Sequence, residues 1–342
     1  MTRQSAPSNR RRFLQTGLTA GLAWTALADS LLAAQDDSPG VSHRPLGKTG
    51  QKISILGLGG WHIAKAAQDT GEATAIRIMH EAIDNGLNFF DNSWDYHDGY
   101  AEELMGRAVR DRRDRVFLMT KNCERDYQGT MACLDDSLRR LQTDCIDLWQ
   151  FHEINYDNDP DWVFDRGGLR AALEAQKAGK VRFIGFTGHK DPRLFLSMLA
   201  KPYVWASSQM PINVCDWFFR SFTNQVIPVC LEKGTGVIGM KCLGGSPDGQ
   251  NARLARIGLA TGDELLRYAL SLPVCSVVTG IRTQADLEQS LRVGREFRPM
   301  TDEQLTEFRN RFQEVAGDGR HELFKTETLF DGGHHRRQHG LH

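Results

Sequence analysis

The sequence predicts a single α/β domain with the fold of a (β/α)8 TIM barrel, in which eight parallel strands alternate with eight helices. Short apolar runs alternate with longer amphipathic runs from about residue 44 to about residue 297, which gives eight strand–helix units. The competing fold is an open doubly wound sheet, which typically carries a GxGxxG motif after its first strand. The segment Gly57-Leu58-Gly59-Gly60-Trp61-His62 lacks that spacing. The barrel is therefore the predicted fold.

The first predicted unit begins with a hairpin turn over residues 46–52, followed by the first strand and its exit over 53–60. A helix is expected over 73–85 because its apolar residues recur on one face, and Gly86 should end it. The further predicted strands lie near 87–91, 116–121, 146–151, 181–186, 204–209, 236–240 and 274–279. The further predicted helices lie near 100–110, 129–141, 162–179, 191–200, 222–234, 261–271 and 284–296.

Composition favours a soluble globular protein with an ample core, since 40% of the 342 residues are hydrophobic and 25% are charged. The formal net charge of −1 gives no electrostatic reason to expect nucleic acid or an acidic membrane surface as a partner. Seven cysteines are scattered without CxxC spacing. We therefore expect buried free thiols and no zinc or iron–sulfur site.

Residues 1–34 are predicted to be a targeting segment. The run Arg10-Arg11-Arg12-Phe13-Leu14 precedes a weakly apolar, small-residue stretch that ends at Ala34, which resembles a twin-arginine export signal. The twin-arginine machinery is then a partner, and the protein is exported to a periplasmic or extracytoplasmic location without stable membrane insertion. A membrane anchor is one alternative because the apolar stretch is near spanning length. A basic extension of a cytoplasmic protein is the other.

The rest of the chain divides into three predicted parts. Residues 35–42 are a polar linker, 43–315 form the barrel, and 316–342 form a C-terminal tail. The tail is rich in histidine, and a metal ion is one interpretation of that composition. A solvated tail is the favoured interpretation, since no fixed helix or turn spaces these imidazoles as ligands.

Three successive predicted strands each end on an ionisable side chain, namely Asp91, Lys121 and His152, and Tyr96 follows on the loop after Asp91. In a parallel barrel the C-terminal ends of the strands open onto one face, where such folds carry their chemistry. Taken singly, these residues are better explained as a strand-end cap, a rim charge, a satisfied polar residue and a loop anchor. Their joint placement favours a catalytic site.

The order Asp91, Tyr96, Lys121, His152 resembles the catalytic set of the aldo-keto reductases. The resemblance implies reduction of a carbonyl group, with hydride from a nicotinamide and a proton from Tyr96. Lys121 should make the phenol more acidic, and Asp91 should hold Lys121 in place. His152 should donate a hydrogen bond to the substrate oxygen.

The loop after the eighth predicted strand suggests a phosphate site. Thr283 and Asp286 form a capping box that places backbone N–H groups and Arg282 at a corner where barrels often bind phosphate. Lys241 ends the seventh strand beside it. An ordinary helix cap beside a surface arginine is the alternative. The two cations favour NADP (NADPH) as the cofactor, with NAD as the second choice.

The family resemblance adds cofactor and substrate contacts. Gln209 resembles the glutamine that contacts the nicotinamide amide, and Glu288-Gln289 resembles the pair that touches adenine. Thr187-Gly188 stands where Ser-Asn is common, and Met240 where an aromatic residue commonly stacks. The complete expected cofactor set is Gly59, Thr187, Gln209, Met240, Lys241, Leu243, Gly280, Arg282, Glu288 and Gln289. The expected substrate-lining set is Trp61, His62, Trp94, Asn213 and Trp217, for which loop packing is the alternative.

The predicted function is an NADP-dependent oxidoreductase that reduces an aldehyde or ketone, supplied as a small molecule, to an alcohol, or runs the reverse reaction. An NADP-binding redox sensor or accessory subunit with little turnover is the first alternative. A metal-dependent barrel hydrolase is the last. That class needs clustered histidine and carboxylate ligands, and only Asp91 and His152 qualify.

Overall fold

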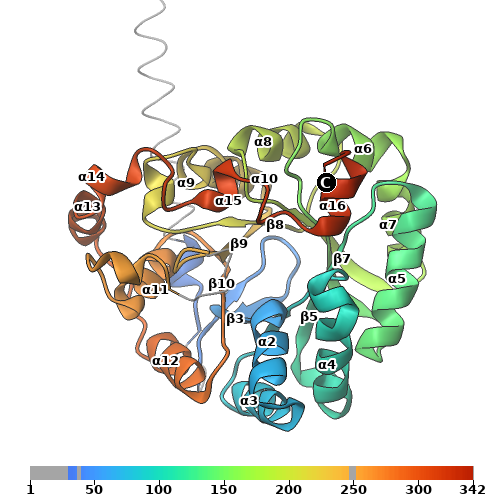
Figure 1. Ribbon diagram of the computed structural model, residues 1–342, viewed down its shortest axis with the longest axis horizontal. Helices are drawn as coiled ribbons and strands as arrows, with labels where there is room; N and C mark the ends of the chain where they lie inside the picture. The colour runs from blue at the N-terminus through green and yellow to red at the C-terminus, as the bar shows by residue number, and fades with distance from the viewer. Residues whose placement is uncertain (1–29, 37–39, 246–251, 342) are drawn as a thin grey trace, which may run out of the picture.

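The computed structural model describes residues 30–36, 40–245 and 252–341, and within them eight parallel strands close into a barrel (Figure 1). The order of strands around the barrel is β10-β3-β4-β5-β6-β7-β8-β9. This confirms the predicted TIM barrel. The strands are β3 (Leu56–Gly59), β4 (Phe89–Asp91), β5 (Phe117–Asn122), β6 (Ile146–Phe151), β7 (Val181–Thr187), β8 (Ser207–Pro211), β9 (Gly236–Met240) and β10 (Ser276–Thr279).

Helices surround the strands and cover the outside of the barrel (Figure 1). Those that precede β8 are α2 (Gly60–Thr70), α3 (Glu72–Asp84), α4 (Tyr100–Val109), α5 (Tyr127–Leu141), α6 (Asp159–Asp165), α7 (Gly168–Lys177) and α8 (Pro192–Ala200). Those that follow are α9 (Phe222–Gln225), α10 (Ile227–Lys233), α11 (Gly262–Ser271), α12 (Gln284–Arg295), α13 (Asp302–Asn310), α14 (Gln313–Ala316), α15 (Leu323–Thr326) and α16 (Gly333–Gln338). Short 3-10 turns are η1 (Tyr96–Gly99), η2 (Arg110–Arg115), η3 (Cys215–Trp217) and η4 (Ala255–Ile257).

The predicted hairpin closes the N-terminal end of the barrel. Strands β1 (His43–Pro45) and β2 (Lys52–Ser54) pair antiparallel across the turn. Leu46 and Ile53 are fully buried and pack in one apolar cluster with barrel residues such as Phe89. The first barrel strand expected within 53–60 is present as β3, but it begins later than expected, at residue 56, because residues 52–54 belong to the hairpin. The seven cysteines are free thiols, as expected, and all except Cys145 are buried.

Two predicted helices are each divided in the structure. The helix expected over 162–179 is α6 followed by α7, with a break at Gly167. This glycine has a φ of 91°, in the left-handed region that glycine enters without steric cost. The helix expected over 222–234 is α9 followed by α10, whose first turn contains a proline. Hydrophobic periodicity continued across both breaks, so it did not reveal them.

The C-terminal segment, residues 317–341, packs against the barrel and is not a solvated tail. Phe324 and Lys325 are buried, and the Lys325 Nζ lies 2.7 Å from an Asp216 carboxylate oxygen. In Figure 1 the segment runs in red from α14 past α15 to α16, which lies beside α6. There His339 Nε2 lies 3.2 Å from an Asp159 carboxylate oxygen. The prediction failed because the segment is anchored by buried ion pairs, which leave no hydrophobic period in the sequence.

The predicted targeting segment lies largely outside the described residues, so it stays a prediction. The predicted linker has contacts with the barrel at both described ends: Gln35 accepts hydrogen bonds from Arg44, and Val41 is fully buried. Over the described residues, none of the helices combines the length and apolarity needed to cross a bilayer.

Candidate active site

The register of three adjacent strands places the ionisable groups side by side. Asp91 of β4 pairs with Met119 of β5, two residues before Lys121. Lys121 pairs with Gln150 of β6, two residues before His152. Because side chains alternate along a strand, residues two apart point to the same side. The two-residue stagger therefore repeats from strand to strand and brings Asp91, Lys121 and His152 together at the C-terminal end of the barrel.

Lys121 is the ionic centre of the site and is only 1% exposed. Its ammonium donates to a carboxylate oxygen of Asp91 and to the carbonyl oxygen of Asn92 at 2.6 Å. It also donates to the Tyr96 hydroxyl oxygen at 3.3 Å. The other Asp91 oxygen accepts a hydrogen bond from Gln209 Nε2 at 3.1 Å. A buried cation is thus paired, hydrogen-bonded and held against the phenol.

Tyr96 is a phenol that keeps its proton. Burial raises the pKa of Tyr96 well above its usual value, and the negative charges of Asp91 and Asp95 add to this effect. Burial and these carboxylates therefore outweigh the acidifying effect expected of Lys121. A protonated phenol is what a proton donor requires, and the neighbouring ammonium stabilises the tyrosinate formed by the transfer.

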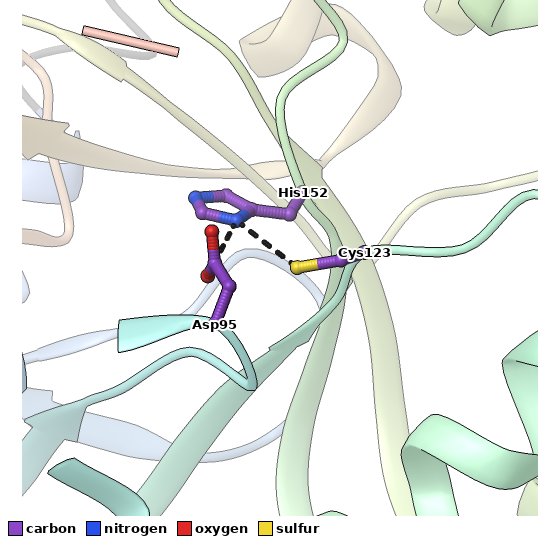
Figure 2. A group of neighbouring side chains, drawn as sticks. All are labelled: Asp95, Cys123 and His152. Carbon is purple, nitrogen blue, oxygen red and sulfur yellow. Dashed lines mark hydrogen bonds and ion pairs between the residues drawn. The ribbon is translucent and has the colours of Figure 1, made fainter. Parts of the chain in front are cut away.

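His152 lies directly after β6 and meets a polar cluster through Nδ1. This nitrogen is 3.1 Å from Ser93 Oγ, 3.3 Å from Asp95 Oδ1 and 3.5 Å from Cys123 Sγ. Figure 2 shows Asp95 and Cys123 converging on the same ring nitrogen. Burial lowers the pKa of His152 from its usual 6.5, while Asp95 acts in the opposite direction. The imidazole is therefore mainly neutral at pH 7.

A cavity of about 650 Å³ opens at this end of the barrel, a size within the usual range for small-molecule sites. Asp91, Tyr96, Lys121 and His152 all line it. The other predicted contact residues on its wall are Gly59, Trp61, His62, Trp94, Thr187, Met240, Lys241, Leu243 and Gly280.

Two predicted substrate residues do not line the cavity. Asn213 is fully buried, where its Nδ2 donates to Glu322 Oε1 at 3.1 Å and its Oδ1 accepts from the Cys215 amide. It therefore ties the loop after β8 to the C-terminal segment. The Trp217 ring lies 3.5 Å from the Arg309 guanidinium carbon. The Trp217 side chain therefore packs against α13, in line with the packing alternative stated for the aromatic residues.

The predicted phosphate corner is occupied by the protein's own carboxylates. Arg282 Nη2 donates to Asp69 Oδ2 at 2.6 Å. The amides of Arg282 and Thr283 both donate to Asp286 Oδ2, at 3.0 and 2.9 Å. Neither Arg282 nor the expected adenine pair on α12, Glu288 and Gln289, lines the cavity. The phosphate and adenine contacts stay predictions.

Lys241, the second predicted cation, does line the cavity. Its Nζ lies 5.3 Å from the ring centroid of Phe324 and 5.4 Å from that of Phe330, both in the C-terminal segment. Burial lowers the pKa of Lys241 from 10.5 to about 8. Its φ of 57° is in the left-handed region, a conformation that costs a non-glycine residue free energy and is often found at functional sites.

Two further acidic residues, Glu153 and Asp331, line the cavity wall and were not among the predicted site residues. Both carboxylate oxygens of Glu153 accept from the Gly332 amide, at 2.9 and 3.0 Å. Asp331 lies 3.0 Å from His189 Nε2 and 2.9 Å from Lys190 Nζ. Glu153 could have been predicted from the sequence, because it directly follows His152. Asp331 could not, because it reaches the cavity only through the fold of the C-terminal segment.

The reacting end of the cavity fits a nicotinamide. Among the described residues, Gln209 Oε1 and Thr279 Oγ1 are buried without a hydrogen-bond partner. Gln209 does not line the cavity but contacts Asp91, which does, and Thr279 lines it directly. A carboxamide offers the donors and the acceptor that these atoms lack. The chain's residues therefore suit the nicotinamide end of the cofactor, whereas Arg282 is turned toward Asp69.

Comparisons with known proteins indicate one family. The model of the Aldo/keto reductase family matches residues 55–264. The uncharacterized oxidoreductase YrpG of Bacillus subtilis is 30% identical over 249 residues, 63% of this chain and 71% of that protein. L-galactose dehydrogenase of Arabidopsis thaliana is 27% identical over 207 residues, 57% of this chain and 63% of that protein.

Among solved structures, aldo-keto reductase AKR11C1 of Bacillus halodurans, in its holo form, aligns with a TM-score of 0.64 and 25% identity. The alignment covers 83% of this chain and 99% of that one. The family match spans more than half of the chain, and the curated relatives are oxidoreductases. The chain therefore belongs to the aldo/keto reductase family.

Proposed function

We propose that this protein is an NADP-dependent oxidoreductase that reduces a small aldehyde or ketone to the alcohol, or runs the reverse reaction. The observation that carries the proposal is the buried Lys121 ammonium, which contacts the Asp91 carboxylate and lies 3.3 Å from the Tyr96 hydroxyl. All three residues line one cavity with His152. Family membership supports the reaction class.

Each of the four side chains has a separate role in the proposed reaction. Tyr96 donates its proton to the oxygen of the carbonyl as negative charge develops there. Lys121 stabilises the resulting tyrosinate, and Asp91 keeps Lys121 charged and in place. His152 orients the substrate oxygen. When bound, the reduced nicotinamide supplies the hydride. A proton donor positioned in this way contributes about 10²–10⁴ in rate.

The preference for NADP over NAD rests on fewer contacts than the proposed reaction does. Lys241 lines the cavity as a cation below pH 8. Arg282 would join it only by exchanging Asp69 for a phosphate. NAD is the alternative cofactor. It has no 2′-phosphate, so the Arg282–Asp69 ion pair would stay intact when NAD binds.

We also propose export of the folded protein by the twin-arginine route, which rests on the Arg10-Arg11 pair and the weakly apolar stretch that follows. Replacement of both arginines by lysine should keep the protein in the cytoplasmic fraction. An unchanged distribution between cell fractions would contradict export by this route.

The direct test of the reaction is NADPH oxidation by the full chain, followed by absorbance with a reactive aromatic aldehyde. Tyr96→Phe should lower turnover by at least about 10²-fold and leave NADPH binding, measured by fluorescence, unchanged. Tyr127→Phe is the matched control, because its hydroxyl contacts Glu174 on the outside of the barrel. Turnover by Tyr96→Phe at the wild-type rate would contradict the proposal.

A further inference from the structure

The polar side chains around Nδ1 of His152 have no role in the reaction proposed above. Ser93 Oγ donates a hydrogen bond to Asp95 Oδ1 at 2.6 Å. Both groups lie close to His152 Nδ1, at 3.1 and 3.3 Å. His152 and Ser93 are buried, and only 15% of the Asp95 side chain is exposed. Two side chains from one short stretch, residues 93–95, therefore contact a single imidazole nitrogen.

The hydrogen-bond directions in this cluster determine which ring nitrogen carries the proton. Because the Ser93 hydroxyl donates to Asp95, its oxygen can only accept from Nδ1. The Asp95 carboxylate is also an acceptor. Burial acts to raise the pKa of Asp95, but hydrogen bonds from His152 and Ser93 and the positive charge of Lys121 act in the opposite direction and favour the carboxylate. Both neighbours therefore require an N–H at Nδ1.

Cys123 is the third neighbour of Nδ1 and does not change this assignment. Its thiol is a weak donor and a weak acceptor, and it is the most distant of the three groups at 3.5 Å. With the proton on Nε2 instead, the Nδ1 lone pair would face a carboxylate at 3.3 Å. The contact would then be repulsive, whereas the Nδ1–H arrangement makes it a charge-assisted hydrogen bond.

The other ring nitrogen is the one available to a ligand. His152 lines the cavity, and in the described part of the chain Nε2 has no hydrogen-bond partner. A neutral imidazole protonated at Nδ1 presents a lone pair at Nε2. Such a nitrogen accepts a hydrogen bond from an alcohol and repels the oxygen of a carbonyl group.

We propose that Asp95, held by Ser93, is a positioning residue that keeps the proton of neutral His152 on Nδ1, so that Nε2 favours an alcohol hydroxyl over a carbonyl oxygen. A carbonyl is oriented only after His152 gains a second proton, because Nε2 then carries an N–H. This consequence for the reaction rests on the proposed function. The position of the proton in the resting protein is independent of it.

The direction of the pH effect follows from this arrangement. Carbonyl reduction uses the protonated form of His152, so it should decline as pH rises through the pKa of His152. Binding of the alcohol uses the neutral form and should improve over the same range. The charged and titratable groups that face His152 from the surrounding elements are Asp91, Asp95, Tyr96, Lys121, Cys123, Arg125 and Glu153.

The first test is ¹⁵N NMR of the full chain labelled at histidine, at a pH where His152 is neutral, with its signals identified by their loss in His152→Gln. We expect a protonated Nδ1 and an unprotonated Nε2. Asp95→Asn should move the proton toward Nε2, since the new carboxamide can donate to Nδ1. Asp98→Asn removes an exposed carboxylate from the same turn and should leave the pattern unchanged. A proton on Nε2 in the wild type would overturn the proposal.

The second test is the pH profile of kcat/KM for reduction of the aromatic aldehyde. In the wild type it should fall about tenfold per pH unit above the pKa of His152, because one proton is required. Asp95→Asn should flatten this profile. If the wild type shows no turnover, the proposed function fails, while the NMR result still decides the tautomer. An identical slope in Asp95→Asn would overturn the role of Asp95.

Discussion

The two ends of the cavity are built in different ways. At the reacting end, Asp91, Lys121 and His152 come from three adjacent strands whose register places them side by side. At the opposite end, near β9 and β10, the charged groups on the cavity wall and just outside it meet partners from distant parts of the chain. Arg282 contacts Asp69, and Lys241 faces two rings of the C-terminal segment.

This difference indicates which part of the site is fixed before a ligand binds. Lys121 and Asp91 are buried and paired, so their positions follow from the barrel itself. The Arg282–Asp69 pair is 25% and 37% exposed, and pairs with such exposure contribute little to stability. We therefore expect the reacting end to be preorganised and the opposite end to rearrange when the cofactor binds.

The largest effect should come from breaking the buried pair. Lys121→Met leaves the Asp91 carboxylate buried without its cation and should lower the free energy of unfolding by about 3–5 kcal/mol. Lys180→Met is the matched control, because the Lys180–Asp135 pair is 41% and 65% exposed and should cost less than about 1 kcal/mol. Urea unfolding measures both. Equal costs for the two variants would contradict preorganisation at the reacting end.

An intermediate effect should come from loosening the C-terminal segment. Asp331→Asn weakens contacts with His189 and Lys190 in a buried setting and should cost about 1–3 kcal/mol locally. We expect faster hydrogen–deuterium exchange over residues 329–341 and a higher KM for the aldehyde. Asp318→Asn removes an exposed contact with Arg320 and should change neither. Unchanged exchange in Asp331→Asn would show that the segment is held elsewhere.

A smaller effect is expected on cofactor affinity, where removal of Arg282 should change the Kd for NADPH but not that for NADH. Arg282→Met should raise the Kd for NADPH about tenfold, equal to about 1.4 kcal/mol, and leave the Kd for NADH nearly constant. Asp69→Asn weakens the competing ion pair and should lower the Kd for NADPH. Parallel changes for both cofactors would contradict a 2′-phosphate contact by Arg282.

The smallest effect should be the titration of Lys241. Its pKa in the folded protein, about 8, lies below the ordinary 10.5, so the folded state loses this proton first. Between these values the unfolded state binds more protons, and the contribution of Lys241 to stability therefore rises with pH. Affinity for the anionic cofactor should fall a few-fold over the same range. Lys241→Met should remove this fall when Kd is measured against pH, and a persisting fall would contradict the assignment.

The same comparison explains what the sequence could reveal. The strand ends at Asp91, Lys121 and His152 were visible because an apolar run that stops at a charged residue is a local pattern. The break at Gly167 was not, since glycine is also found within helices. Asp331 and Arg282 depend on contacts between residues far apart in the chain, and no local pattern encodes such a partner. The high pKa of Tyr96 likewise follows from burial and neighbouring carboxylates rather than from its position after Asp91.

The most direct test of the proposed function is transfer of deuterium from NADPH to the product. The full chain is incubated with an aromatic aldehyde and NADPH deuterated at the transferred position of the nicotinamide, and the alcohol is analysed by mass spectrometry. The proposed reaction predicts one deuterium on the former carbonyl carbon, and loss of the product in Tyr96→Phe. An alcohol without deuterium, or equal labelled product from Tyr96→Phe, would contradict hydride transfer assisted by this site.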